Sequence, residues 1–235
     1  MTSQAKYLNI FRKARIISIG NEKISYEVKR RNVKYPRLEF FGRKLILILP
    51  KNYKDEREII DKKLSWIYRK YKYFSSLIRE DLKNKFYIFG KEKEIKIDNN
   101  LVIFENKTFS KKEFIKYLKN ILLEKIKKLV NEYSKELNVK VKKIIIRSQK
   151  TKLASLSSNY TLSCNIKLVS LKEKLIEYVI YHEMLHFFEK SHNSIFIEMI
   201  KKKFKDFEKI EEELKSFWIS MMENEVWKKL LDKDI

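Results

Sequence analysis

Cysteine, glycine and proline are scarce in this sequence. Its 235 residues include one cysteine, Cys164, three glycines and two prolines. A single cysteine excludes an internal disulfide and is typical of a reducing compartment, so we expect Cys164 to pack as a small apolar side chain. No repeat or low-complexity linker divides the chain, so domain boundaries have to be read from changes of periodicity.

Long apolar runs are also missing. Lys, Arg, Asn or Ser interrupts every apolar stretch of the first twenty residues, which argues against a secretory signal. No uninterrupted apolar run elsewhere reaches the length of a membrane span. We therefore expect a cytoplasmic protein that does not act in a membrane.

Hydrophobic residues make up 44% of the chain and aromatic residues 13%, enough to build a sizeable core. Lysine and arginine number 54 against 31 acidic residues, a formal net charge of +23. Such a basic protein attracts nucleic acid, nucleotides or acidic protein surfaces, although a general bias towards Lys, Ile, Asn and Tyr would give the same charge. Nucleic acid is thus an open partner, and the sequence leaves the oligomeric state undetermined.

The N-terminal part is rich in β-strand signals. Residues 23–49 alternate, and residues 37–41 and 44–49 flank Gly42 as a hairpin that ends at Pro50. Apolar residues then recur at helical spacing from about Asp55 to Asn84, and short strands are expected at 86–90, 92–98 and 101–105. We assign residues 1–106 to this β-rich and helical part.

Residues 107–235 form the second predicted part. Ser110 with Glu113, and Ser170 with Glu173, have the spacing of capping boxes that begin two helices, with strands expected at 139–148 and 160–169 between them. Residues 210–231 read as one amphipathic helix that packs on the core, covers a cleft or binds a partner. The pattern predicts an α+β fold.

The second of these helices contains the run His182-Glu-Met-Leu-His186. Four residues along a helix correspond to about 400° of rotation and about 6 Å of rise, so both imidazoles project from one face and can reach one ion. Glu183 lies beside them, where a carboxylate can take a proton from metal-bound water without being a ligand. The spacing predicts a catalytic Zn²⁺ site with Glu183 as the base.

A catalytic zinc ion usually has three protein ligands, and His192 is the candidate for the third. On a continuous helix His192 would lie about 9 Å along the axis and roughly 120° around from His186. The helix therefore has to end, and Ser191 or Asn193 can cap a new helix through residues 195–200. A chain reversal there would return His192 to the metal.

The alternative without a metal site is an amphipathic helix whose histidines are incidental. All three histidines of the chain lie between residues 182 and 192, which favours the metal site. Glu189 has two equally weighted interpretations, because it could orient an imidazole or lie in solvent beside Lys190.

The chain resembles the YgjP-like family of zinc metallopeptidases, which are related in outline to the SprT-like proteases. Three stretches carry the resemblance: Arg147 to Ser158, similar to R-x-Q-K-T-x-W-G-S-C-S-S; Leu162 to Leu168, similar to I-x-L-N-x-x-L; and Tyr178 to His192, similar to Y-V-x-x-H-E-L-x-H-x-x-E-x-x-H. Phe196 matches the phenylalanine that follows the third histidine in the family, and Trp66 and Gly90 add weaker similarity. Metzincins share the histidine spacing but have glycine where this chain has Glu189.

The resemblance implies a zincin-like catalytic core, with an active-site helix beside a short antiparallel sheet, that hydrolyses peptide or protein substrates. It implies that the segment from Gln149 to Asn165 lines the cleft and pairs with an extended peptide, so Gln149 and Asn165 are candidate cleft or supporting residues. Leu153-Ala-Ser-Leu156 stands where the family has Trp-Gly-Ser-Cys. This departure affects the positioning of substrate and leaves the predicted ligands intact.

Two other functions remain open. The stretch with Lys140, Lys142, Lys143, Arg147, Lys150 and Lys152 has no acidic residue and would suit a zinc-dependent hydrolase of nucleotides or other phosphoanhydrides, although no phosphate-binding glycine loop is present. Alternatively, the N-terminal part binds nucleic acid through the aromatic and basic residues 66–74, and the metal is structural. Tyr160, Tyr178 and Tyr181 are available as oxyanion stabilisers, and none can be chosen from the sequence.

Overall fold

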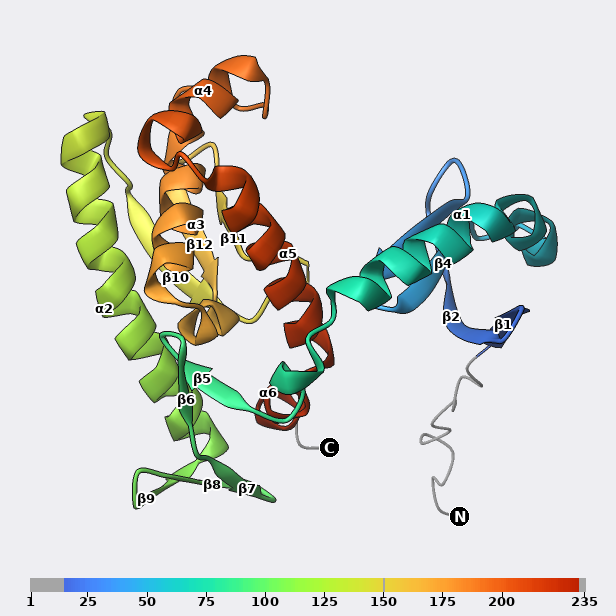
Figure 1. Cartoon of the computed structure of the whole chain (residues 1–235), viewed down its shortest axis with the longest axis horizontal. Helices are drawn as coiled ribbons and strands as arrows, with labels where there is room; N and C mark the ends of the chain where they lie inside the picture. The colour runs from blue at the N-terminus through green and yellow to red at the C-terminus, as the bar shows by residue number, and fades with distance from the viewer. Residues whose placement is uncertain (1–14, 150, 233–235) are drawn as a thin grey trace, which may run out of the picture. The chain divides into compact units, whose positions relative to one another are not determined.

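The computed structural model describes residues 15–149 and 151–232. It has an α+β fold, as the sequence predicts, and it divides into two compact units at Ser76 and Leu77 (Figure 1). Within the described residues, no helix is both long enough and apolar enough to cross a membrane.

The first unit is a four-stranded sheet and a helix. The strand order is β1-β2-β4-β3, with bounds β1 (Arg15–Ile19), β2 (Glu22–Arg31), β3 (Arg37–Phe41) and β4 (Lys44–Pro50). Strands β3 and β4 form the predicted hairpin around Gly42, whose φ is +59°. Helix α1 (Glu56–Leu77) packs Ile60 and Ile67 against the buried leucines of β4, so the sheet and the helix share one small core.

The second unit begins with small antiparallel sheets that lead into a long helix. They consist of β5 (Phe86–Ile88) with β6 (Lys91–Lys93), and of β7 (Lys96–Asp98), β8 (Leu101–Phe104) and β9 (Lys107–Ser110). Ser110 and Glu113 form the predicted capping box, and helix α2 (Lys111–Leu137) follows. Because Phe86, Phe104 and Phe114 pack ring against ring, these strands belong to the core of the second unit.

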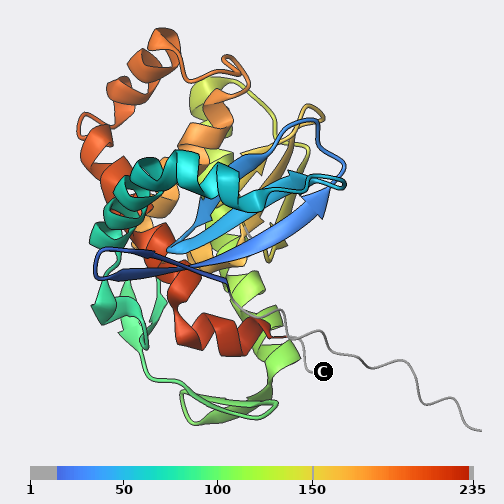
Figure 2. The same ribbon diagram turned by 90° about the vertical axis from the view of Figure 1, so that its right-hand side faces the viewer.

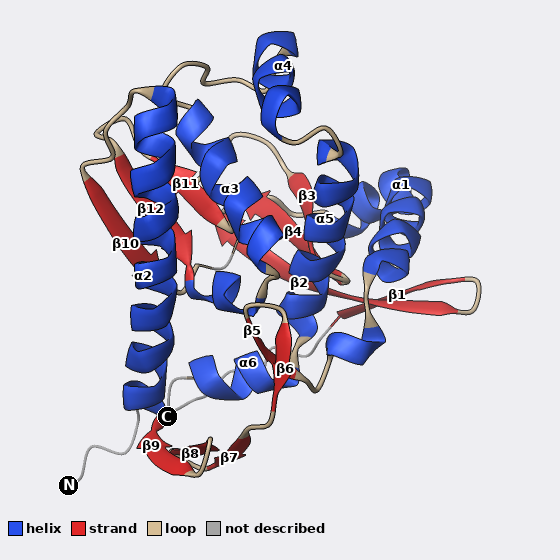
Figure 3. Cartoon of the chain, turned by 60° about the vertical axis from the view of Figure 1, so that its left-hand side comes forward, coloured by secondary structure: helices blue, strands red, loops and turns tan. Residues whose placement is uncertain are grey.

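A three-stranded sheet lies beneath the active-site helix. Its order is β10-β12-β11, with bounds β10 (Lys143–Arg147), β11 (Ala154–Leu156) and β12 (Thr161–Asn165). The sheet is mixed, whereas the sequence predicts an antiparallel one, because β10 runs parallel to β12 and only β11 runs antiparallel to it. Helix α2 contacts β10 and helix α3 (Glu173–Leu185) contacts β11, as Figure 3 shows.

Three helices complete the chain: α4 (Ser194–Lys203), α5 (Phe207–Glu223) and α6 (Glu225–Leu231). The sequence predicts a single helix over 210–231, but the chain changes direction between α5 and α6 (Figure 2). The break lies at Asn224, which is fully buried. Its side chain accepts a hydrogen bond from Trp227 N at 2.8 Å and donates to Lys85 O at 2.9 Å, so a tertiary contact ends the helix.

The second predicted capping box is wrong. Helix α3 begins at Glu173, and the side chain of its N-cap residue, Lys172, makes no capping hydrogen bond. Ser170 is buried at the end of a 3₁₀ turn, η2 (Ile166–Ser170), where its hydroxyl accepts a hydrogen bond from Trp227 Nε1 at 3.1 Å. The serine is therefore used in packing between distant segments.

The two compact units divide earlier in the sequence than the predicted boundary at residue 106. Residues 77–106 contribute Phe86, Ile88, Val102 and Phe104 to the core that also contains the active-site helix. Sequence periodicity cannot detect this, because short alternating strands look alike whichever core they cover. A functional division into residues 1–106 and 107–235 stays a prediction.

Gly90 offers a test of the packing around α3. Its φ is +75°, and a Cβ added there would lie 2.7 Å from Lys172 Cγ and 3.0 Å from Lys172 Cα. We expect Gly90→Ala to lower the free energy of unfolding by about 2 kcal/mol or more, because left-handed backbone alone costs an L-residue roughly 1–2 kcal/mol. Chemical denaturation measures the change.

The matched control is Gly20→Ala. Gly20 has φ of +58°, but nothing lies within 4 Å of a Cβ added there. This substitution should carry the backbone cost alone. Equal losses at Gly20 and Gly90 would contradict the close contact with Lys172.

Candidate active site

Helix α3 carries the three motif residues on an otherwise apolar surface. Most of the helix is covered by the sheet and by neighbouring helices, and its buried residues are Leu175, Ile176, Tyr178, Val179, Ile180, Tyr181, Met184 and Leu185. His182, Glu183 and His186 are only partly exposed. Polar groups at such positions require partners, and the structure supplies them.

The chain reverses its direction immediately after α3. Phe188 N and Glu189 N both donate to Leu185 O, at 2.9 and 3.1 Å, which closes the helix in a tight turn. Asn193 then caps α4 by accepting a hydrogen bond from Phe196 N at 3.1 Å. The predicted break and the predicted new helix are both confirmed.

This reversal brings the three histidines together. His192 Nε2 lies 3.0 Å from His182 Nε2, and one potential ligand atom from each of His182, His186 and His192 lies within 4.8 Å of the others. Among residues 15–149 and 151–232, this is the only group of three or more His, Cys, Asp or Glu side chains close enough to hold one metal ion.

Glu189 contributes to the turn through two different groups. Its main-chain oxygen accepts a hydrogen bond from His186 Nδ1 at 2.8 Å, which leaves His186 Nε2 free. Its carboxylate accepts hydrogen bonds from Ser191 N at 3.2 Å and Ser191 Oγ at 3.0 Å, and these bonds lower the pKa of Glu189. The carboxylate therefore holds the loop that precedes His192, while the carbonyl holds an imidazole.

Phe196, on the first turn of α4, packs against all three imidazoles. Its ring centroid lies 4.9 Å from that of His182, 5.0 Å from that of His186 and 4.7 Å from that of His192. The Phe196 side chain is buried, so it restricts the orientation of the three imidazole rings from the protein interior. Sequence reasoning noted Phe196 only as part of a family pattern and assigned it no role.

The surroundings of His182 favour its uncharged form. Burial, together with the neighbouring His192 and His186, lowers the pKa of His182 to about 3. An uncharged imidazole is the form that binds a metal ion. A hydrogen bond from the other ring nitrogen to a backbone carbonyl, as His186 makes, is typical of histidines that ligate metals. A set of three imidazoles fits a zinc ion.

Glu183 is held by the neighbouring edge strand. Its Oε2 accepts a hydrogen bond from Leu156 N, on β11, at 2.9 Å. Burial raises the pKa of Glu183, while the Leu156 N–H and the nearby His186 and Lys152 act in the opposite direction. The carboxyl is therefore a stronger base than an exposed glutamate and has a fixed orientation.

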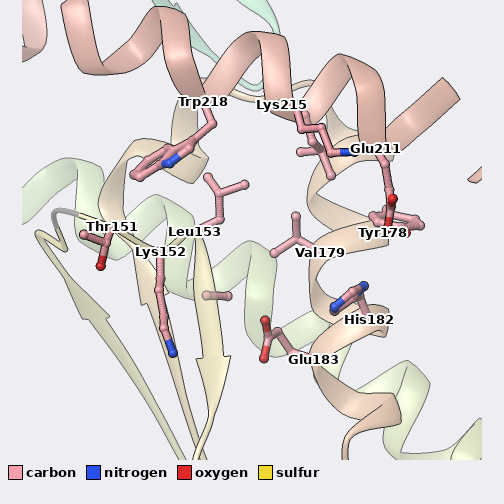
Figure 4. A pocket seen from close by; sticks show the side chains of 12 residues that line it. Thr151, Lys152, Leu153, Tyr178, Val179, His182, Glu183, Glu211, Lys215 and Trp218 are labelled. Carbon is pink, nitrogen blue, oxygen red and sulfur yellow. Dashed lines mark hydrogen bonds between the residues drawn. The ribbon is translucent and has the colours of Figure 1, made fainter. Parts of the chain in front are cut away.

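A pocket of about 360 Å³ opens beside His182 and Glu183 (Figure 4). Residues 151–154, α3 and α5 surround it, and its lining consists of Thr151, Lys152, Leu153, Ala154, Tyr178, Val179, His182, Glu183, Glu211, Leu214, Lys215 and Trp218. The residues contributed by α5 were missed as site residues, because nothing in the sequence relates them to the motif.

Gln149 and Asn165 lie behind the cleft and support it. Asn165 is fully buried, and its Nδ2 donates to Gln149 O at 2.8 Å and to Lys152 O at 2.9 Å. Gln149 Nε2 donates to Ser163 Oγ at 2.8 Å. These bonds fix the loop that supplies one wall of the pocket, and a role for either side chain in substrate binding stays a prediction. Lys150 lies outside the described residues.

The three candidate tyrosines lie in different environments. Tyr178 lines the pocket, and its hydroxyl donates to Glu211 Oε1 at 2.9 Å. Tyr160 stacks on Phe187, with centroids 4.8 Å apart, and Tyr181 is buried against Tyr133. Only Tyr178 shares the pocket with the motif residues. Cys164 is fully buried, and burial raises the pKa of its thiol, in line with a packing role.

A helix with two histidines and a glutamate, followed after a turn by a third histidine, has the arrangement expected for the metal centre of a metallopeptidase. Comparison with family models gives a match to the YgjP-like metallopeptidase domain over residues 34–217. The chain therefore belongs to the YgjP-like metallopeptidase family, as its motifs suggest. Membership implies a bound metal ion, typically zinc, and hydrolysis of peptide bonds.

Two crystal structures of metallopeptidase zymogens show local similarity. Jannalysin of Methanocaldococcus jannaschii is 38% identical over 39% of this chain and 86% of its own, with a TM-score of 0.34. Abylysin of Pyrococcus abyssi is 22% identical over 38% of this chain and 90% of its own, with a TM-score of 0.35. The comparison with curated proteins gives no match. The family assignment rests on the family model.

The depressed pKa of His182 gives a testable pH dependence. The folded-state pKa of about 3 lies below the ordinary value of 6.5, so the unfolded chain binds the proton more readily. In metal-free protein, this contribution to stability should be complete above about pH 6.5 and should be lost as the pH falls towards 3. Denaturant unfolding in the presence of chelator at several pH values measures it.

His182→Phe keeps an aromatic ring in contact with Phe196 and removes the titrating group. The free energy of unfolding of this variant should change less with pH over the same range. If the wild type and this variant show parallel pH profiles, the neutral buried state of His182 is wrong.

Proposed function

We propose that this chain is a zinc-dependent peptidase in which His182, His186 and His192 bind the metal ion and Glu183 activates the attacking water. The convergence of the three imidazoles within 4.8 Å supports the ligand set. Membership of a metallopeptidase family supports the reaction class.

In this proposal the three histidines hold the metal ion, and Glu183 transfers protons. A zinc ion in such a site supplies Lewis-acid chemistry, lowering the pKa of a water molecule and polarising a carbonyl group. Glu183 follows His182 in the sequence and is anchored by Leu156 N at 2.9 Å, which leaves its other carboxylate oxygen for the reaction. We infer that it accepts the proton of the water and delivers it to the leaving amine.

The environment of Glu183 favours this role. A carboxylate with a raised pKa accepts a proton more readily than an exposed one, and burial raises the pKa of Glu183. The apolar residues around α3 keep the surroundings of the reaction low in polarity, which strengthens hydrogen bonds to charged groups.

Strand β11 is the proposed docking strand for substrate. β11 is an edge strand, and Leu153 O and Ser157 N bond to β12. The alternation of an antiparallel ladder turns the main-chain groups of Ala154 and Leu156 to the other side. Leu156 N is used by Glu183, so the N–H and C=O of Ala154 are the groups that an extended peptide would pair with.

Glu183→Gln tests the assignment of the base. We expect it to retain one zinc ion per chain and to lose about 100- to 10,000-fold in kcat/KM on peptides, because removal of a general base costs that much. Elemental analysis and a quenched-fluorescence peptide assay measure the two quantities. Loss of zinc together with activity would place Glu183 among the ligands instead.

His192→Ala, compared with Lys190→Ala as a neighbouring exposed control, tests the third ligand. The histidine variant should lose stoichiometric zinc, whereas the lysine variant should retain it. Full zinc affinity in His192→Ala would overturn the assignment.

Glu189→Ala tests the support of the metal loop. The variant keeps the main-chain carbonyl that holds His186 but loses the carboxylate that bonds Ser191. We expect zinc affinity to fall about tenfold, the lower end of the range for residues that orient ligands. Competition with a chromophoric chelator measures the affinity, and Glu189→Gln, which keeps an acceptor, should lose less. Unchanged zinc affinity in both variants would mean that the Glu189 carboxylate lies in solvent and does not support the metal site.

A further inference from the structure

The pocket beside the metal centre has largely apolar walls. Leu153 comes from the loop before β11, Val179 from α3, and Leu214 and Trp218 from α5. Val179 and Leu214 are buried, and Trp218 is half-buried with its ring at the pocket wall (Figure 4). Apolar walls of this kind favour a ligand group that leaves water on binding.

Trp218 is held in place from outside the pocket. Lys167 Nζ lies 6.0 Å from the centroid of its ring and donates a hydrogen bond to Met221 O at 2.8 Å. A lysine whose ammonium is tied to the backbone of α5 restricts the movement of the indole that it contacts. The wall is therefore formed before a ligand arrives, which reduces the entropy lost on binding.

The charged groups of the pocket do not favour a cationic ligand. The Glu211 carboxylate accepts the hydrogen bond of the Tyr178 hydroxyl. Lys152 and Lys215 both line the pocket and are exposed, and they balance the two acidic residues of the lining, Glu183 and Glu211. A lysine or arginine side chain would therefore meet no net negative charge to offset the loss of its hydration, whereas an apolar side chain meets the four apolar walls.

The location of the pocket, next to His182 and Glu183, determines which part of a substrate can enter it. His182 and Glu183 belong to its lining, so a group bound there lies next to the reacting carbonyl. A volume of about 360 Å³ accommodates a large side chain.

We propose that this pocket selects substrates with a large apolar side chain, preferably an aromatic one, on the residue adjacent to the scissile bond, with Trp218 as the determining contact. The inference rests on the proposed peptidase function for the identity of the ligand as a peptide.

A binding experiment tests the selection separately from catalysis. The zinc-loaded Glu183→Gln variant is titrated with fluorescein-labelled peptides of Ala, Ser and Gly that contain one varied residue, which is Phe, Leu, Ala, Lys or Asp. Anisotropy gives Kd. Phe and Leu peptides should bind at least about tenfold more tightly than the Ala peptide, because each methylene placed in an apolar pocket is worth 10- to 200-fold. The Lys peptide should bind no more tightly than the Ala peptide.

Substitutions on α5 connect the selection to the pocket. In the same background, Trp218→Ala should reduce the preference for Phe over Ala to less than about threefold, and Trp218→Phe should restore most of it. Leu214→Phe, which fills the pocket, should weaken the binding of the Phe peptide more than the binding of the Ala peptide. Trp66→Ala, in the other compact unit, is the matched control and should leave the preference unchanged. Zinc content and circular dichroism verify that each variant is folded.

The outcomes separate this inference from the proposed function. Equal affinity for Phe and Ala peptides, or a preference that Trp66→Ala and Trp218→Ala reduce equally, overturns the pocket assignment even if the wild type cleaves peptides. If the wild type cleaves no peptide but the preference depends on Trp218, the catalytic proposal fails and the pocket stands as a peptide-binding site.

Discussion

The site depends on the reversal of the chain after Leu185. Without it, His192 would continue along the axis of α3 and remain out of reach of His182. Two hydrogen bonds to Leu185 O close the helix, and the Asn193 cap starts α4 in a new direction. The same turn places Phe196 against the three imidazoles. One short loop therefore sets the ligand geometry and its supporting surface together.

The site also joins the helix to the sheet. Glu183 accepts a hydrogen bond from the main chain of β11, so the proposed base and the proposed substrate strand are held at a fixed spacing. Asn165 fixes the loop before β11 through the carbonyls of Gln149 and Lys152. Burial keeps His182 uncharged and raises the pKa of Glu183. The low-polarity core thus favours the uncharged imidazole of His182 and makes Glu183 a stronger base.

Several elements could be predicted because their signals are local. The hairpin around Gly42, the capping box at Ser110 and the α3 motif each depend on residues close in sequence, and the structure has all three. Ser170 has the same local signal as Ser110, yet its hydroxyl bonds to Trp227 instead of capping a helix. The helix break at Asn224 likewise depends on the carbonyl of Lys85. Contacts between distant segments overrode the local pattern in both cases.

The sequence alone determined which residues are candidates to bind a metal ion, which one is the candidate base, and that the helix has to end before His192 if that histidine is to join the other two. These follow from residue type and from helical geometry, which act over a few residues. Only the tertiary structure decided what surrounds that chemistry. Trp218, Leu214 and Glu211 line the pocket because α5 packs beside α3, and no periodicity in the sequence encodes which helices become neighbours.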